Sequence, residues 1–183
     1  DISLYLQPRL DRNKRVRFLL HPEISQQVSR LFLIKPASPT AVSLLNSMLD
    51  CVANSPAQCG YASSDIVSWT LSAADNGSLA PVTRHNMLVR LVDVQVAAKD
   101  YRAALQSALI GLAHTPHDVT YRIMAADMLL LLDRCAEAED QLKLVLGTEN
   151  ISSAEKSTAH ELLQKARKRV PCRDRSPLTP AQM

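Results

Sequence analysis

The feature that most constrains the fold of this chain is a repeat of apolar and small residues at an offset of about 34 positions. At this offset Ala104 aligns with Ala138, and other apolar or small residues align by the same shift. The further pairs are Tyr101 with Cys135, Ala108 with Leu142, Leu112 with Leu146, Leu91 with Ala125, and Val92 with Ala126. A fixed period of this length is typical of stacked supersecondary units, each of which buries its apolar edge against a neighbour.

The period favours tetratricopeptide-like helical hairpins. Such a unit has about 34 residues, small side chains where its two helices cross, and a proline near its end. Ala126, Ala138 and Pro116 stand at such places, whereas Arg122 occupies a position where an aromatic or aliphatic residue is usual. An ordinary helical bundle with alanine at its crossings is the alternative. We predict two hairpins of this kind followed by one closing helix.

Composition indicates helices in the rest of the chain as well. Glycine is scarce at 4 residues and aromatic residues make up 4% of the chain, which argues against sheets and their turns. Leucine and alanine favour helices instead. Apolar spacing and turn residues predict helices over 81–98, 101–113, 119–132, 135–146 and 152–170. The predicted fold class is all-α, with antiparallel helical hairpins that form a tetratricopeptide-like α-solenoid in the C-terminal half.

Three regions follow from these patterns. Residues 1–80 form a helical region without the period, packed on the repeats. Residues 81–170 hold the two hairpins and the closing helix. Residues 171–183 contain three prolines and no apolar period, so we expect a disordered tail.

Charge and hydropathy bear on the class of partner. The formal net charge of +3 makes no case for nucleic acid. No run of about 18 apolar residues could span a membrane. The chain begins with Asp1, which indicates a processed chain or a fragment. The basic residues between Arg9 and Arg17 indicate either a juxtamembrane segment attracted to anionic lipid or the solvated face of a helix.

Four cysteines, Cys51, Cys59, Cys135 and Cys172, permit two disulfides with three possible pairings. Cys51 and Cys59 bracket a short polar loop, which suits a local bridge. Cys172 follows the last predicted helix, from which it could fold back onto Cys135. The alternative is four free thiols. No CxxC motif occurs, so we predict no zinc site.

No pattern of catalytic residues is present. A serine nucleophile lacks its GxSxG elbow, and no glycine-rich phosphate loop appears. His114 and His117 flank Pro116, which interrupts the helix that a histidine pair would need to bind a metal together. We therefore predict no catalytic, cofactor or metal site. A small helical enzyme is the least favoured of the functions considered.

Charged residues on the first helices of the hairpins are candidates for partner binding, because those helices line the groove of such repeats. These candidates are Arg84, Arg90, Arg122, Asp127 and Arg134. An arginine there could hold a carboxylate or phosphate by its planar guanidinium group. The simpler interpretation is solvated surface, with Asp127 paired to Arg122 or Arg134.

The stretch from Trp69 through Asn76-Gly77 and on through "PVTRHNMLVRLVDVQVAAKDYRAALQSALIGLAHTPHDVTYRIMAADMLLLLDRCAEAEDQL" resembles soluble C-terminal domains of bacterial membrane proteins of the O-antigen polymerase and ligase type. The resemblance covers about residues 66–146. It implies a periplasmic domain tethered to the inner membrane, a setting that suits paired cysteines. The catalytic residues of that family lie in membrane parts that this chain lacks, so none is carried over.

Two functions follow as expectations. The first is a non-catalytic interaction domain, the periplasmic part of a larger membrane protein in surface polysaccharide assembly. Its partner would be a protein or peptide, with a glycan-bearing partner as the narrower case, and membrane contact would come through the parent chain. The second is a stand-alone adaptor, cytoplasmic and unrelated to polysaccharides.

Overall fold

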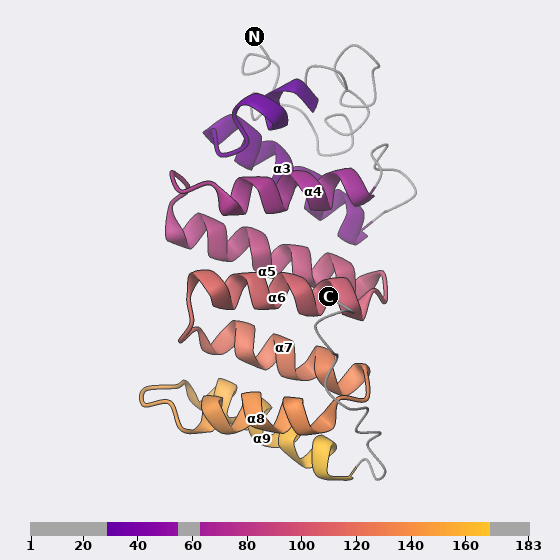
Figure 1. The fold of residues 1–183 in the computed structure, drawn as a ribbon, viewed down its shortest axis with the longest axis vertical. Helices are drawn as coiled ribbons and strands as arrows, with labels where there is room; N and C mark the ends of the chain where they lie inside the picture. Colours follow the sequence, from indigo (N-terminus) through magenta and orange to yellow (C-terminus); the bar gives the residue numbers. More distant parts are fainter. Residues whose placement is uncertain (1–28, 55–62, 169–183) are drawn as a thin grey trace, which may run out of the picture. The chain divides into compact units, whose positions relative to one another are not determined.

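The structure, a computed structural model, describes residues 29–54 and 63–168, and these contain helices and no strands (Figure 1). A helical segment at 29–34 comes first. The helices that follow are α3 (Pro39–Asn54), α4 (Ser63–Asp75), α5 (Pro81–Ala97), α6 (Tyr101–His114), α7 (Val119–Leu131), α8 (Cys135–Leu146) and α9 (Ser153–Lys168). The predicted all-helical class is confirmed for the described residues. The basic stretch 9–17, Cys59, Cys172 and the tail 171–183 lie outside them.

The chain divides into two compact units, residues 1–97 and residues 98–183. In the described part of the first unit, α3, α4 and α5 contact one another pairwise. Its core is aliphatic and includes Leu44, Leu45 and Leu49 of α3 and Leu88 and Leu91 of α5. The helical segment 29–34 joins this core through Phe32, whose ring stacks on that of Trp69 with 4.7 Å between the ring centroids.

The division falls after α5, whereas the repeat pattern placed the boundary at residue 80, before α5. Polar contacts explain why α5 belongs with the preceding helices. Arg84 of α5 donates hydrogen bonds to backbone carbonyls at and after the end of α4. Arg90 of α5 forms an ion pair with Asp50 of α3. The repeat pattern rests on the spacing of apolar residues and carries no information about such polar contacts.

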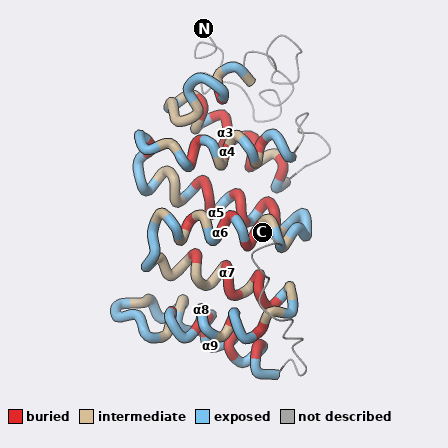
Figure 2. The backbone as a smooth tube through the Cα atoms, viewed as in Figure 1, coloured by how far each residue is buried: buried red, intermediate tan, exposed pale blue. Residues whose placement is uncertain are grey.

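In the second unit α7 is the central helix, in contact with α6, α8 and α9, and α8 also packs on α9. The positions where these helices meet are small. Ala104, Ala108, Ala125 and Ala138 have no exposed surface, as the red segments of Figure 2 show for the inner faces of the helices. Alanine at these positions lets neighbouring helix backbones approach closely. Most residues that carried the repeat pattern lie in the core, whereas Tyr101, Leu112 and Leu146 are half-buried.

The backbone repeats itself at the same period. Helices α6 and α8 start at residues 101 and 135, and α7 and α9 start at 119 and 153, so both pairs are 34 apart. The residue two positions before α6, Lys99, has φ 60°, and its counterpart before α8, Asp133, has φ 58°. Left-handed backbone at the same position of each 34-residue repeat shows that the turns, as well as the helices, recur.

Helix α9 is a register equivalent of α7 that the sequence alone did not reveal. Ala159 stands 34 positions after Ala125, and both are fully buried. However, His160 and Gln164 are exposed on α9, where α7 has the buried Ala126 and Leu130. The described part of the second unit therefore ends in a helix with one apolar side facing the stack and a polar side facing away from it.

The N-terminal ends of these helices are capped by side chains. Asp100 accepts a hydrogen bond from the backbone N–H of Ala103, and Asp118 accepts one from that of Tyr121. At α9, Ser152 and Glu155 form a reciprocal capping box: the Ser152 hydroxyl accepts from the Glu155 N–H, and the Glu155 carboxylate accepts from the Ser152 N–H at 2.9 Å. The pattern Ser-x-x-Glu fixes the start of α9.

Replacing Ser152 by Ala should reduce the stability of the second unit by about 1 kcal/mol at neutral pH, because the Glu155 N–H loses its acceptor and the Glu155 carboxylate loses the hydroxyl donor. Hydrogen bonds from the Ser152 hydroxyl and N–H lower the pKa of the Glu155 carboxyl. The part of the stabilisation that comes from the carboxylate is therefore complete above the unfolded pKa of about 4.3 and is lost as pH falls through the lowered folded pKa. Urea unfolding at pH 7 and pH 3 measures this, with the exposed Ser157→Ala as the matched control. The cost of Ser152→Ala should be smaller at pH 3 than at pH 7, and an equal cost at both pH values would contradict the prediction.

Candidate functional site

Arg84, the first of the predicted partner-binding arginines, is held by the chain itself. Its Nε donates to the carbonyl of Ala74 at 2.7 Å, and one terminal nitrogen donates to the carbonyls of Asn76 and Leu79 at 3.1 and 3.3 Å. Ala74 and Asn76 lie at the C-terminal end of α4, where carbonyls lack helical partners and a cation is favourable. Arg84 therefore ties the α4–α5 turn to the start of α5.

Arg122 does the same for the second unit. One terminal nitrogen donates to the carbonyl of Pro116 in the α6–α7 loop at 2.5 Å, and the other donates to Oε1 of Gln141 on α8 at 3.0 Å. The side chain thus joins the loop before α7 to the helix after it. This explains why an arginine can occupy a position where the repeat pattern usually has an apolar residue.

Arg84 and Arg122 share one place in the architecture. Each is the fourth residue of its helix, α5 or α7, and each binds carbonyls of the loop that leads into that helix. We call this pair the loop clasps. Arg84 donates to backbone oxygens, and Arg122 donates to one backbone oxygen and one side-chain oxygen. Binding of an anionic partner would require them to give up these bonds.

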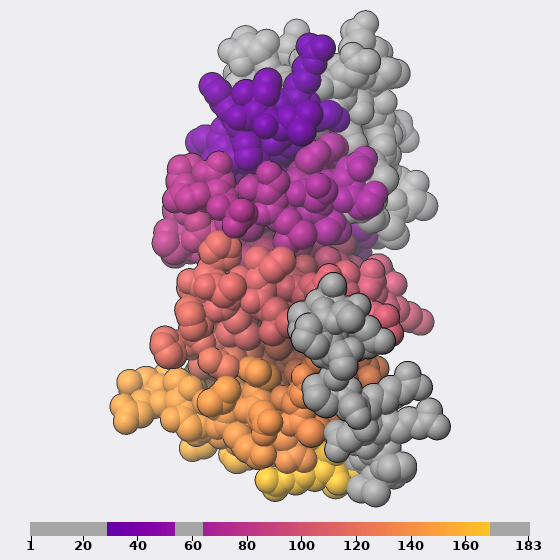
Figure 3. All heavy atoms as spheres, in the orientation of Figure 1, coloured from indigo at the N-terminus to yellow at the C-terminus, as the bar shows by residue number. Residues whose placement is uncertain are grey.

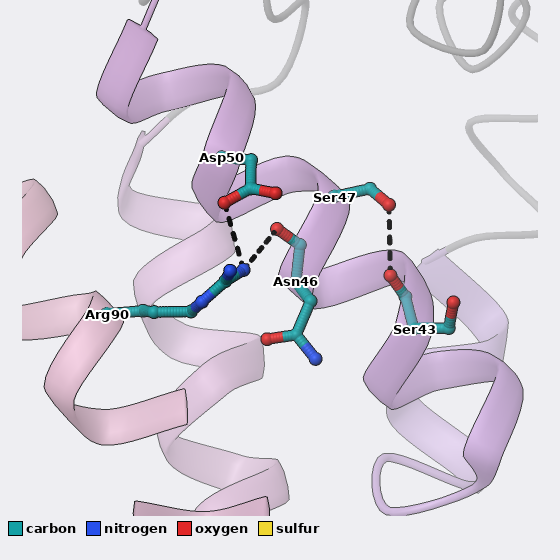
Figure 4. A network of polar contacts seen from close by, with 5 residues as sticks. All are labelled: Ser43, Asn46, Ser47, Asp50 and Arg90. Atoms are coloured by element: carbon teal, nitrogen blue, oxygen red, sulfur yellow. Dashed lines mark hydrogen bonds and ion pairs between the residues drawn. The ribbon is translucent and has the colours of Figure 1, made fainter. Parts of the chain in front are cut away.

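Arg90 lies on the surface of the first unit and bridges α5 to α3 (Figure 4). One of its terminal nitrogens lies 2.9 Å from a carboxylate oxygen of Asp50 and 3.4 Å from the carbonyl of Asn46. Beside it, Ser47 returns a hydrogen bond to the carbonyl of Ser43 within α3. An exposed pair of this kind contributes little to stability.

Asp93 lies one turn after Arg90. Burial raises the pKa of its carboxyl, and the Arg90 charge opposes this effect. Its counterpart at 34 positions is Asp127 on α7, which is half-buried and takes part in a polar or ionic contact. Both helices thus carry an aspartate at one register position, which sequence alignment of apolar residues did not detect.

Arg134 precedes α8 and forms a two-pronged ion pair with Glu137, with both nitrogen–oxygen distances at 2.7 Å. It pairs within its own helix turn. The five candidate residues therefore do not form one cluster: Arg84 and Arg90 belong to the first unit, and Arg122, Asp127 and Arg134 belong to the second. Each of them has an intramolecular contact.

The accessible face of α7 is largely apolar. Besides Val119 and Arg122, its partly or fully exposed residues recur at spacings of three and four, which places them on one side of the helix. They are Thr120, Ile123, Met124, Asp127 and Leu131. We call this set of five the α7 face. Of these residues, Ile123, Met124 and Leu131 are apolar and could contact a partner. The sequence analysis considered only charged residues as candidates and therefore missed them.

Cys51 and Cys135 are disulfide-bonded, so neither is a free thiol. Cys59 and Cys172 lie outside the described residues, and the predicted pairing therefore stays a prediction. Within 29–54 and 63–168, no group of three or more histidine, cysteine, aspartate or glutamate side chains could hold a metal ion. His114 is half-buried at the end of α6 and His117 is exposed in the following loop.

No protein-family model matches this chain, and no curated protein shows significant similarity to it. In the part of the chain that the structure describes, no helix has the length and apolar character to cross a bilayer.

Proposed function

We propose that this chain is a non-catalytic interaction domain built from tetratricopeptide-like hairpins. The observation that carries the proposal is the recurrence of local structure at 34 residues: helix starts at 101 and 135 and at 119 and 153, and left-handed residues at Lys99 and Asp133. This period and the alanines at the crossings are what a tetratricopeptide-like stack requires. Repeat stacks of this kind are built to present an extended surface to a partner.

Helix contacts support the same arrangement. In such stacks the first helix of one hairpin touches both its own second helix and the first helix of the next hairpin. Helix α7 contacts α8 and α9 in this way, and α3 contacts α4 and α5 in the same way within the first unit. This shared contact pattern supports a hairpin order that includes α3 and α4, where the sequence shows no period.

The α7 face is the proposed contact surface for a protein or peptide partner. It replaces the loop clasps, Arg84 and Arg122, as the candidate, because their side chains already donate hydrogen bonds within the chain. Ile123 and Met124 remain, both half-buried and both on the side of α7 away from its buried core. Apolar anchors of this type carry most of the energy of an interface.

Site-specific photo-cross-linking tests this surface. A photoreactive residue at Ile123 or Met124, in cells of the source organism, should give a discrete adduct with a partner. The same residue at Asp140, on the exposed face of α8, is the matched control and should give none. Figure 3 shows the side chains of α8, in orange, at the surface. Equal adducts at all three positions, or none at any, would contradict the proposal.

For the whole protein we propose the periplasmic part of a membrane protein in surface polysaccharide assembly. The sequence resemblance supports this, and so do the bonded cysteines Cys51 and Cys135, which are usual in an oxidising compartment. The alternative is a stand-alone adaptor. The coding sequence upstream of Asp1 distinguishes between the two. Several membrane-spanning segments there would support the membrane parent, and a start codon directly before Asp1 would exclude it. Mass measurement after thiol alkylation, with and without reductant, tests the two disulfides.

A further inference from the structure

The helical segment 29–34 exposes two large apolar side chains next to one that is firmly anchored. Phe32 is buried and its ring stacks on that of Trp69. The following residues, Leu33 and Ile34, are 79% and 73% exposed. Because Phe32 holds the segment on α4, the outward orientation of Leu33 and Ile34 is a fixed property of the first unit.

Two cations flank this apolar pair. Arg30 precedes it and Lys35 follows it, and both are exposed. Among residues 29–54 and 63–168 neither has an ion-pair partner, whereas Arg84 and Arg90, elsewhere in the same unit, bind carbonyls or a carboxylate. The result is a small surface with two apolar side chains between two exposed positive charges, which we call the 30–35 patch.

We propose that the 30–35 patch docks on an anionic lipid bilayer surface. Leucine and isoleucine gain by entering the boundary between headgroups and acyl chains, while lysine and arginine reach anionic headgroups from the same backbone. The charge of the patch is complementary to such a surface. A protein partner would need a matching surface of about 800 Å² on each side, far more than two side chains provide. A bilayer needs no matching shape.

The inference stands apart from the proposed function of the hairpins, because it concerns the first unit and holds for a tethered domain or a free one. A lipid surface would set the orientation of this unit against the membrane. The basic stretch 9–17 would be drawn to the same surface, but it lies outside the described residues, so the experiment has to separate the two.

Vesicle flotation with the full chain tests the proposal. The probes are vesicles of phosphatidylcholine with 30% phosphatidylglycerol, vesicles of phosphatidylcholine alone, and the same anionic vesicles at raised salt, where about 30% is chosen to mimic an anionic surface potential. The variants are Leu33→Ser with Ile34→Ser, and Arg30→Gln with Lys35→Gln. Val82→Ser is the matched control, since Val82 is 73% exposed in the same unit and its neighbouring Arg84 is bound to carbonyls.

The wild-type chain should float with the anionic vesicles only, and less at raised salt. Loss of both apolar side chains should lower the partition coefficient at least about tenfold. Loss of both cations should lower it about fivefold for each charge. Val82→Ser should bind like wild type. Fluorescence of Trp69, the one tryptophan of the chain, checks that each variant keeps its Phe32–Trp69 stack.

Three outcomes would overturn the inference. Absence of binding to anionic vesicles is the first. Full binding by the folded Leu33→Ser, Ile34→Ser variant is the second, because the basic stretch or another surface would then carry it. The third is self-association of the wild type, abolished in that variant and seen without vesicle binding, which would assign the patch to a second copy of this chain.

Discussion

Replacing Gly111 by Ala is expected to destabilise the second unit by about 2 kcal/mol, the net of about 3 kcal/mol for overpacking and about 1 kcal/mol for the better helix former. A Cβ at this position would fall within 2.6 Å of three atoms of the Tyr121 ring. Tyr121 is 1% exposed and cannot turn away, so α6 and α7 would have to separate. Urea unfolding followed by circular dichroism measures the loss.

Two controls isolate the clash. Gly77→Ala adds a methyl group where no atom lies within 4 Å, and its effect should stay within about 0.5 kcal/mol. In a Tyr121→Leu background, Gly111→Ala should become neutral or stabilising, because the ring is gone. A destabilisation of the same size in both backgrounds would show that the contact with Tyr121 is not the cause.

Replacing Arg84 by Met should destabilise the first unit by about 2 kcal/mol, because partly buried carbonyls of Ala74, Asn76 and Leu79 lose a charged donor. Trp69 on α4 lies in the same unit and reports its unfolding by fluorescence. Because Arg84 binds carbonyls of its own chain, the free energy of unfolding should fall even when no partner is present.

Arg90→Met is the matched control, on the same helix with the same change of side chain. Its pair with Asp50 is exposed, so the cost should remain below about 1 kcal/mol. If Arg84→Met left stability unchanged and weakened partner binding instead, the original interpretation of Arg84 as a groove residue would be restored.

Much of the helical architecture was predictable from sequence because its signals are local. The apolar period, together with Pro81, Pro116 and the turn at Lys99, located α5 to α8 within one or two residues. The alanines that aligned at 34 positions, such as Ala104 and Ala138, are fully buried as expected. Small side chains that recur at a fixed period in helices indicate that another helix packs closely there. This signal can therefore be recognised in the sequence before the fold is known.

The repeat equivalence of α9 could not be predicted in this way. Its residues at the register of Tyr121, Ala126 and Leu130 are Glu155, His160 and Gln164, which are chemically unlike their counterparts. Only the backbone, through the shared start and the buried Ala159, shows the equivalence. A sequence repeat records what is buried, and α9 leaves exposed the side where α7 buries Ala126 and Leu130.

The candidate site was predicted less well than the fold. The sequence pattern placed Arg84 and Arg122 on helices α5 and α7, where both side chains are half-buried. It gave no sign that loop carbonyls lie within 3.3 Å, because the path of a loop depends on tertiary structure. For the same reason the apolar α7 face was overlooked: Ile123 and Met124 are indistinguishable in sequence from core residues.

The polar side of α9 has a consequence for how copies of this domain meet. With Ala and Leu in place of His160 and Gln164, α9 would expose an apolar surface. Copies of the domain could then associate head to tail through it and form an open filament. With those two polar residues exposed, α9 does not present such a surface on that side. Its surface chemistry thus disfavours the head-to-tail contact that would let copies of the second unit grow into a filament through α9.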